Sequence, residues 1–197
     1  MDDSSPARDP IGKSATGPAV DAPVKILAIS GSLNGSSSNT ALLRVIRDAA
    51  SLPDEIALFE ALDDIPHFSP DREREPAPPA VAALRAALRD ADGVLIATPE
   101  YAGGMPGVLK NALDWLVGSG ELYEKRVVVV SAAPSPERGH NARESLERTL
   151  RMQGAPVCES FTVAVPHGQT EAAFAETADD VLLRTTRALA AGPHDNA

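Results

Sequence analysis

"VKILAISGSLNGSSSNTALLRVIRDAA", residues 24–50, combines three patterns that together decide the fold. It opens with an apolar run over Val24 to Ser30 that is typical of a buried strand. It closes with residues 41–50, whose apolar side chains recur at helical spacing. Between them lies an uncharged turn of serine, glycine and asparagine, which is more polar than an ordinary surface turn needs. The stretch therefore predicts a strand, a ligand-binding turn and a helix in immediate succession.

The rest of the chain repeats this alternation of short apolar runs and helical stretches, which indicates a parallel sheet buried on both faces. The expected strands span Val24 to Ser30, Glu55 to Phe59, Gly93 to Thr98, Arg126 to Ser131 and Val157 to Val165. The expected helices carry the apolar stripes Leu42, Val45, Ile46 and Ala49; Val81, Leu84 and Leu88; Leu109, Leu113 and Leu116; Leu146 and Leu150; and Phe174, Val181, Leu182 and Leu189. Five strands with intervening helices make a three-layer α/β sandwich, whose ligands bind beyond the carboxyl ends of the strands.

The length of 197 residues predicts one domain, which we place at residues 23–192. The first 22 residues are rich in Asp, Ser, Pro and Gly and are expected to be disordered, and residues 193–197 form a short C-terminal tail. The leader has no apolar stretch of the length that a signal peptide or a membrane helix requires. Its "GKS" at residues 12–14 lacks the earlier glycine of a phosphate-binding Walker loop, because Ala7 stands at that position.

Composition narrows the class of ligand. A net charge of −10 and a pI near 4.8 argue against nucleic acid, which is bound by clustered Lys and Arg, so a small molecule is the expected partner. Cys158 is the only cysteine, which excludes an intrachain disulfide and suits a reducing cytoplasm. It is expected to be a buried, apolar thiol. The histidines are scattered, so no metal site is expected; they are His67, His140, His167 and His194.

The turn at residues 31–40 has the composition of a phosphate site. Gly31 lets the backbone turn sharply off the strand, and Ser37, Ser38 and Asn39 stand where the helix begins, next to its positive end. A serine-rich helix cap with a flexible turn and no ligand is the alternative at this point. The glycine spacing does not match G-x-G-x-x-G, which disfavours a dinucleotide site of the NAD type and favours a terminal monophosphate.

A second loop, "TPEYAGGMPGVLKNALDW" at residues 98–115, follows the third expected strand. Gly103 and Gly104 allow the backbone to approach a flat ligand closely, and Tyr101 offers a ring to pack against it. A helix is expected to begin near Pro106, because proline suits a first helical turn. This loop therefore predicts a site for a planar group beside the phosphate site.

With these two loops in this order, the chain resembles the NADPH-dependent FMN reductase family of flavodoxin-like proteins over about residues 24–165. The resemblance implies a five-stranded parallel sheet in the order 2-1-3-4-5 and noncovalently bound FMN. The cofactor contacts that it implies are Ser32, Asn34, Ser37, Ser38 and Asn39 for the phosphate, and Pro99, Glu100, Tyr101, Ala102, Gly103 and Ser131 for the ring. Many members have an arginine where Asn34 stands and an asparagine where Ala102 stands, so the chain lacks one cation and one polar contact.

The resemblance also implies an activity. Hydride from NADPH or NADH would pass to FMN and on to a small acceptor such as free flavin or a quinone, with no side chain acting as nucleophile or metal ligand. A homodimer or homotetramer is implied as well. The alternatives are a flavodoxin-type single-electron carrier, disfavoured by an aromatic content of 4%, and a binding module that has lost flavin. The acceptor is not legible, nor is the choice between NADPH and NADH, because no motif supplies a cation for a 2′-phosphate.

Four further features need a structure to interpret them. Glu100 is either an acid/base group or a side chain turned to solvent, with the second favoured. Trp115 is expected in the core or at a subunit contact rather than against flavin. The loop Ala61 to Pro79 either edges the site or a subunit contact, or is a solvated excursion. The loop Ser131 to His140 lacks the paired glycines often found there, which leaves its contacts open.

Overall fold

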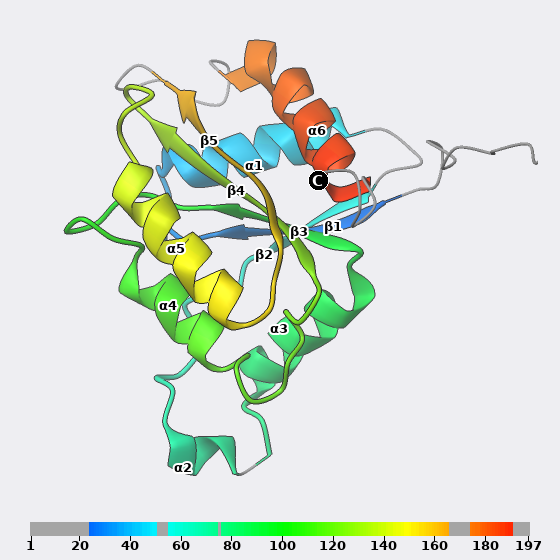
Figure 1. The fold of residues 1–197 in the computed structure, drawn as a ribbon, viewed down its shortest axis with the longest axis vertical. Helices are drawn as coiled ribbons and strands as arrows, with labels where there is room; N and C mark the ends of the chain where they lie inside the picture. Colours follow the sequence, from blue (N-terminus) through cyan, green and yellow to red (C-terminus); the bar gives the residue numbers. More distant parts are fainter. Residues whose placement is uncertain (1–23, 51–54, 75, 166–173, 191–197) are drawn as a thin grey trace, which may run out of the picture.

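The computed structural model describes residues 24–50, 55–74, 76–165 and 174–190 (Figure 1). The expectations for residues 1–22, for the "GKS" stretch, for residues 193–197 and for His167 and His194 lie outside this part of the chain. Five strands form one parallel sheet in the order β2-β1-β3-β4-β5. Their bounds are β1 Lys25–Ser30, β2 Glu55–Phe59, β3 Gly93–Ala97, β4 Arg126–Ala133 and β5 Val157–Ala164. The predicted sheet and its strand order are confirmed.

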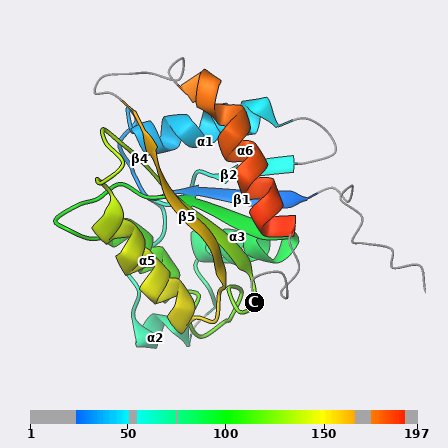
Figure 2. The same ribbon diagram turned by 45° about the horizontal axis from the view of Figure 1, so that its top comes forward.

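The strands alternate their side chains between two helical layers. Leu27 and Ile29 of β1 belong to one apolar cluster, and Ile26 and Ala28 belong to the other. The first cluster is covered by α3 Pro79–Asp90, α4 Gly107–Asp114 and α5 His140–Met152, and the second by α1 Ser38–Ala49 and α6 Ala175–Ala190. Figure 2 shows α1 and α6 together on one side of the sheet, with α3 and α5 on the other. The expected three-layer sandwich is therefore confirmed.

The carboxyl edge of the sheet is stepped. Ser30 pairs with Ala97, and Ala97 pairs with Val130, so β1 and β3 end level with Val130. The sequence predicts that β4 ends at Ser131, but the strand continues to Ala133 because β5 still pairs with it there, Ala133 lying opposite Ala164. The ends of β4 and β5 thus form a wall beyond the ends of β1 and β3.

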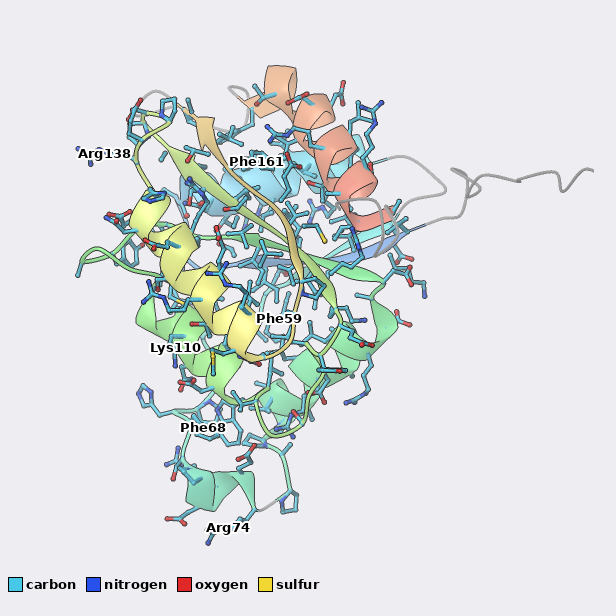
Figure 3. All side chains as sticks on the ribbon, viewed as in Figure 1. Phe59, Phe68, Arg74, Lys110, Arg138 and Phe161 are labelled. Atoms are coloured by element: carbon cyan, nitrogen blue, oxygen red, sulfur yellow. The ribbon has the colours of Figure 1, made fainter. Side chains whose placement is uncertain are left out.

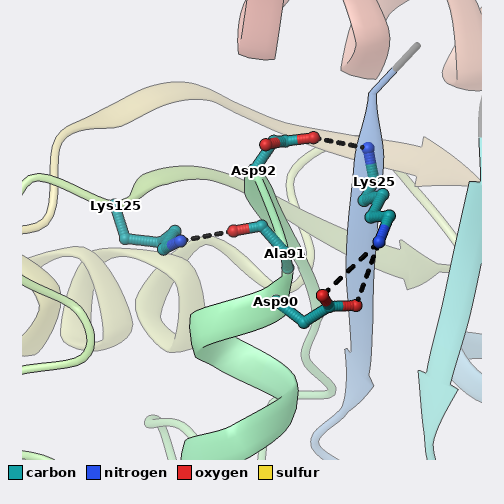
Figure 4. A network of polar contacts seen from close by, with 5 residues as sticks. All are labelled: Lys25, Asp90, Ala91, Asp92 and Lys125. Atoms are coloured by element: carbon teal, nitrogen blue, oxygen red, sulfur yellow. Dashed lines mark hydrogen bonds and ion pairs between the residues drawn. The ribbon is translucent and has the colours of Figure 1, made fainter.

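The opposite edge of the sheet is fastened by a polar network, which Figure 4 shows from close by. The backbone N–H of Lys25 donates to Oδ2 of Asp92 over 2.9 Å, and the N–H of Asp92 donates to the carbonyl of Lys25 over 2.8 Å. Lys25 Nζ contacts the Asp90 carboxylate at 3.4 Å, and Lys125 Nζ donates to the carbonyl of Ala91. These contacts fix the start of β1 against the loop that leads into β3, far from the carboxyl edge.

The excursion between β2 and α3 is docked at Pro66 and Phe68, whereas its short helix has no buried residue. It contains a short helix that the sequence pattern does not predict, α2 Pro70–Glu73. Trp115, fully buried, donates from Nε1 to the carbonyl of Pro66 over 2.8 Å, and its ring meets Phe68 edge-on at 5.3 Å. Asn111 accepts from the N–H of Phe68 over 2.8 Å. Trp115 is therefore a core residue, as expected, and it holds the excursion against the end of α4.

Cys158 is half-buried, so the expectation of a buried thiol is wrong. β5 is an edge strand, and its burial pattern contains more partly exposed than buried positions. An edge strand pairs with one neighbouring strand only, so its side chains are less enclosed than those of the central strands.

Candidate functional site

The serine-rich loop leaves β1 at a position where the backbone is tightly packed. The N–H of Gly31 donates to the carbonyl of Ala97 over 2.8 Å, which joins the ends of β1 and β3. A Cβ atom on Gly31 would lie 3.0 Å from Leu109 Cδ2 and 3.4 Å from Thr98 Oγ1, closer than side chains usually approach. Glycine at this position therefore lets the loop begin directly over β3.

Asn34 organises the loop from within. Its side-chain oxygen accepts from the N–H of Ser36 over 3.0 Å, and its carbonyl accepts from the N–H of Ser37 over 3.0 Å. Its own N–H donates to Ser32 Oγ over 3.2 Å. Asn34 thus supplies turn geometry and no charge.

The N-terminus of α1 is open toward this loop. Ser37 is the N-cap residue and is 9% exposed, yet its side chain makes no capping hydrogen bond, and the first turn contains no acidic residue. The first N–H groups of a helix have no partner within the helix, and they carry its partial positive charge. An uncapped helix start lined by hydroxyl groups is suited to an anion.

Asn39 connects this helix start to β4. Its side chain is 3% exposed, accepts from the N–H of Ala132 over 2.9 Å and donates to the carbonyl of Ala132 over 3.5 Å. Both ends of the amide are therefore engaged with the backbone. The side chain of this predicted ligand residue therefore positions the helix start against β4.

The second predicted loop contains a tight hairpin turn. Tyr101 and Gly104 exchange two backbone hydrogen bonds of 3.0 Å, and the two residues between them have positive φ angles, 50° at Ala102 and 76° at Gly103. Such a turn favours glycine or asparagine at both central positions. Tyr101, 52% exposed, brings its hydroxyl to within 3.3 Å of Ser32 Oγ, so the two loops meet.

Glu100 joins the second loop to α5. Its carboxylate oxygens accept from the backbone N–H of Asn141 over 3.1 Å and from Asn141 Nδ2 over 3.2 Å. The side chain is exposed, as expected, but it is bound at the start of α5 rather than free in solvent. A carboxylate at this position satisfies an N–H group of α5 and offsets the helix dipole.

A cavity of about 370 Å³ lies between the ends of β3 and β4. Three predicted residues line it: Pro99, Glu100 and Ser131. Ser131 is buried, and its hydroxyl donates to the carbonyl of Thr98 over 2.7 Å. The extended end of β4 forms one wall, and the start of the loop to α5 closes the far side. A volume of this size is in the range of small-molecule sites.

The remaining predicted residues surround this cavity without lining it. Ser32 and Asn34 border a separate cavity of about 220 Å³ on the β2 side of the serine-rich loop. Ser37, Ser38 and Asn39 stand at the start of α1, and Tyr101, Ala102 and Gly103 form the hairpin. The site therefore has a polar end at α1 and an enclosed end between β3 and β4.

The other lining residues were not predicted as site residues. They are Thr98, Ala132, Ala133, Pro134, Glu137, Arg138, Gly139 and Asn141, which come from the ends of β3 and β4, the loop before α5 and the first turn of α5. The sequence offered one signal, the glycine at position 139. In the structure Gly139 ends the loop with a φ of 81°, a conformation that favours glycine. Burial lowers the pKa of the neighbouring Arg143, while the carboxylates of Glu147 and Glu100 act in the opposite direction.

Within the described ranges, no cluster of three His, Cys, Asp or Glu side chains could hold a metal ion. His67 and His140 are both exposed. The helices of those same ranges include none with the length and apolar character needed to cross a membrane.

Comparisons with known proteins agree with this geometry. The profile of a family described as NADPH-dependent FMN reductase matches residues 24–170. A probable NADPH:quinone oxidoreductase 2 of Oryza sativa is 42% identical over 95 residues, 47% of each chain. An NAD(P)H-dependent FMN reductase of Pseudomonas aeruginosa is 44% identical over 94 residues, 47% of this chain and 49% of its own. The chain thus spans about half the length of the curated relatives that it matches.

Among solved structures, the NAD(P)H:(acceptor) oxidoreductase FerB of Paracoccus denitrificans is similar over most of its length. It has a TM-score of 0.67 at 25% identity, covering 85% of this chain and 95% of its own. The architecture and the stretch that contains both loops are therefore shared with flavoenzymes.

Proposed function

Because the chain belongs to the NADPH-dependent FMN reductase family, we propose that it is an FMN-dependent NAD(P)H oxidoreductase that reduces a small acceptor such as free flavin or a quinone. The relatives described above act on such acceptors by name. When bound, FMN supplies the group that accepts and passes on a hydride. The protein would bind FMN, orient its ring and polarise it.

One observation carries this proposal: the uncapped, acid-free start of α1. A phosphate there would meet the first N–H groups of the helix together with the Ser37 hydroxyl, which has no capping bond to give up. We assign Ser32, Asn34, Ser37, Ser38 and Asn39 to this end of FMN. Asn34 and Asn39 act by shaping the loop and fixing the helix start, and the others act as donors.

The isoalloxazine ring is assigned to the cavity between β3 and β4. Pro99, Glu100 and Ser131 line it, and the hairpin residues Tyr101 to Gly103, which follow Glu100 directly, are assigned to the same ring. Backbone groups held rigidly in such a cavity stabilise charge that develops on a planar ligand. Ser131 contributes by fixing the carbonyl of Thr98, the residue at which the second loop begins.

The electron-carrier alternative gains no support from this cavity. The residues described as lining it include no aromatic side chain, and the neighbouring hairpin contributes one ring, that of Tyr101. A flavin ring with one open face suits exchange of hydride with small molecules. The net charge of −10 does not by itself indicate a protein partner. The oxidoreductase is therefore the better-supported function.

The test is an absorbance scan of the purified protein after FMN is added and the excess removed, followed by NADPH in air. Retained flavin bands at roughly 370 and 450 nm with continuous loss of NADPH are the expected result. Retained bands without loss of NADPH would transfer the assignment to an electron carrier. Absence of retained flavin would reject the proposed cofactor.

A homodimer or homotetramer is part of the proposal, together with a cytoplasmic location suited to a single cysteine. Large apolar side chains are exposed near the ends of α4 and α5; they are Val117, Tyr123 and Met152. Such exposure is common at subunit contacts. Light scattering coupled to gel filtration measures the mass directly, and a monomer at micromolar concentration would reject this part.

A further inference from the structure

The loop between β4 and α5 presents an arginine whose backbone is firmly held. The N–H of Arg138 donates to the carbonyl of Ser135 over 3.1 Å, and its carbonyl accepts from Thr162 Oγ1 over 3.2 Å. The same hydroxyl oxygen accepts from Arg143 Nη1. A chain of polar contacts therefore runs from α5 through β5 to the backbone of Arg138.

The next residue fixes the direction of the loop. Gly139 has a φ of 81°, and a Cβ atom there would lie 2.7 Å from Ser131 Cβ. Because only glycine fits so close to β4, the loop is held against the wall of the cavity at this point. Arg138 stands directly before this contact and lines the cavity. Figure 3 shows it at the outer end of the loop.

The guanidinium group of Arg138 is exposed and makes no hydrogen bond or ion pair with any side chain that the structure describes. Neighbouring arginines differ in this respect. Arg143 contacts Thr162, and Arg148 and Arg151 pair with carboxylates on α5. Within the described ranges, Arg138 is also the one lysine or arginine that lines this cavity.

We propose that Arg138 binds the 2′-phosphate of NADPH and thereby gives the enzyme a preference for NADPH over NADH; this inference rests on the proposed function. The planar guanidinium matches a phosphate with paired hydrogen bonds. The reactive nicotinamide must reach the cavity, whereas the adenosine end of the dinucleotide extends away from it. Arg138 lines the cavity, and its exposed side chain stands at the outer end of the loop, from which its guanidinium group can reach toward the adenosine end.

The competing anion sites support this assignment. The start of α1 is assigned to the FMN phosphate, and the start of α5 is already occupied by the Glu100 carboxylate. Glu137 also lines the rim, and hydrogen bonding from Ser135 lowers its pKa; as a carboxyl group it offers a phosphate no cation. Arg138 is thus the described cation at the rim that remains for a second phosphate.

The test compares Arg138→Ala with wild type in two assays. Steady-state kinetics use NADPH and NADH with the same quinone at saturating FMN, and calorimetry measures binding of NADP⁺ and NAD⁺ without turnover. Loss of a charged hydrogen-bonding partner predicts a fall of about tenfold to a hundredfold in kcat/KM for NADPH and in NADP⁺ affinity. The values for NADH and NAD⁺ are expected to change less than about twofold.

Two variants sharpen the comparison. Arg138→Lys keeps the charge and is expected to retain part of the preference. Arg187→Ala removes an exposed arginine on α6, next to Ala188, whose carbonyl accepts from Arg126 at the start of β4. This variant changes the net charge by the same amount as Arg138→Ala, but at the opposite edge of the sheet. It is expected to leave binding and turnover of both nucleotides unchanged.

Equal losses for both nucleotides would overturn the proposal, because they would assign Arg138 to the pyrophosphate that NADPH and NADH share. An unchanged preference would overturn it as well, and so would a wild type that binds neither NADP⁺ nor NAD⁺. Failure of the proposed function is separate, since it appears as absent flavin or absent turnover in the wild type.

Discussion

The left-handed conformation of Ala102 leads to a prediction about stability. Its φ of 50° lies in a region where a Cβ atom is crowded, at a cost of roughly 1–2 kcal/mol for ordinary residues. Asparagine adopts this conformation more readily, because its side chain bonds locally. The substitution Ala102→Asn should therefore stabilise the protein by about 0.5–1 kcal/mol.

The size of the effect follows from two opposing terms. Ala102→Gly relieves the same crowding, but glycine adds about 0.4–1 kcal/mol of backbone entropy to the unfolded chain, so its net effect should be near zero. Asparagine avoids this entropic cost. For a chain of this size each kcal/mol corresponds to about 2–4 °C in Tm, so Ala102→Asn should raise the Tm by about 1–4 °C.

The assay is thermal unfolding of the flavin-free protein followed by circular dichroism. Ala86→Asn is the matched control, because Ala86 is an exposed residue inside α3, where asparagine is the poorer helix former by about 0.5 kcal/mol. The same chemical change should therefore have opposite signs at the two positions. A fall in Tm for Ala102→Asn equal to that for Ala86→Asn would refute the conformational argument.

Three further substitutions separate binding from folding. Ser37→Ala should weaken FMN binding about tenfold in a fluorescence titration while changing stability by less than about 0.5 kcal/mol, since no capping bond is lost; a large drop in stability would contradict this. Asn39→Ala should cost about 1–3 kcal/mol in urea unfolding, because the buried N–H of Ala132 loses its acceptor, and an unchanged midpoint would speak against that role. Trp115→Phe should cost about 1 kcal/mol and speed proteolysis within residues 61–74, because the carbonyl of Pro66 loses one of its two donors and keeps only Asn111 Nδ2; unaltered cleavage would show that the contact does not hold the excursion.

The fold could be predicted from the sequence because its strands are buried on both sides. In β3 every residue from Gly93 to Ala97 is buried, and such a run admits few interpretations. β5 lies at the edge of the sheet with a single neighbouring strand, and there the burial of Cys158 was predicted wrongly. The end of β4 was also missed, because the pairing of Ala133 with Ala164 depends on another strand and leaves no mark within β4 itself.

The position of the candidate site could be predicted from the sequence, but the role of each residue in it could not. Periodicity and turn composition located the starts of α1 and α4, and with them both loops. No sequence pattern shows that the side chain of Asn39 bonds to β4 or that Glu100 caps α5, because each contact joins residues far apart in the chain. Arg138 was missed for the same reason, since its position depends on Thr162 and on the fit of Gly139 against Ser131.

The carboxylate of Glu100 at the start of α5 has a consequence for how a ligand enters. The helices α1 and α5 begin beside the candidate site, and the start of either could attract an anion if it were bare. Because Glu100 occupies the start of α5, the charged end of a ligand is left with the start of α1. For a ligand with one charged and one planar end, this side chain would therefore set the orientation of binding, and with it the face of the planar group left for a second substrate.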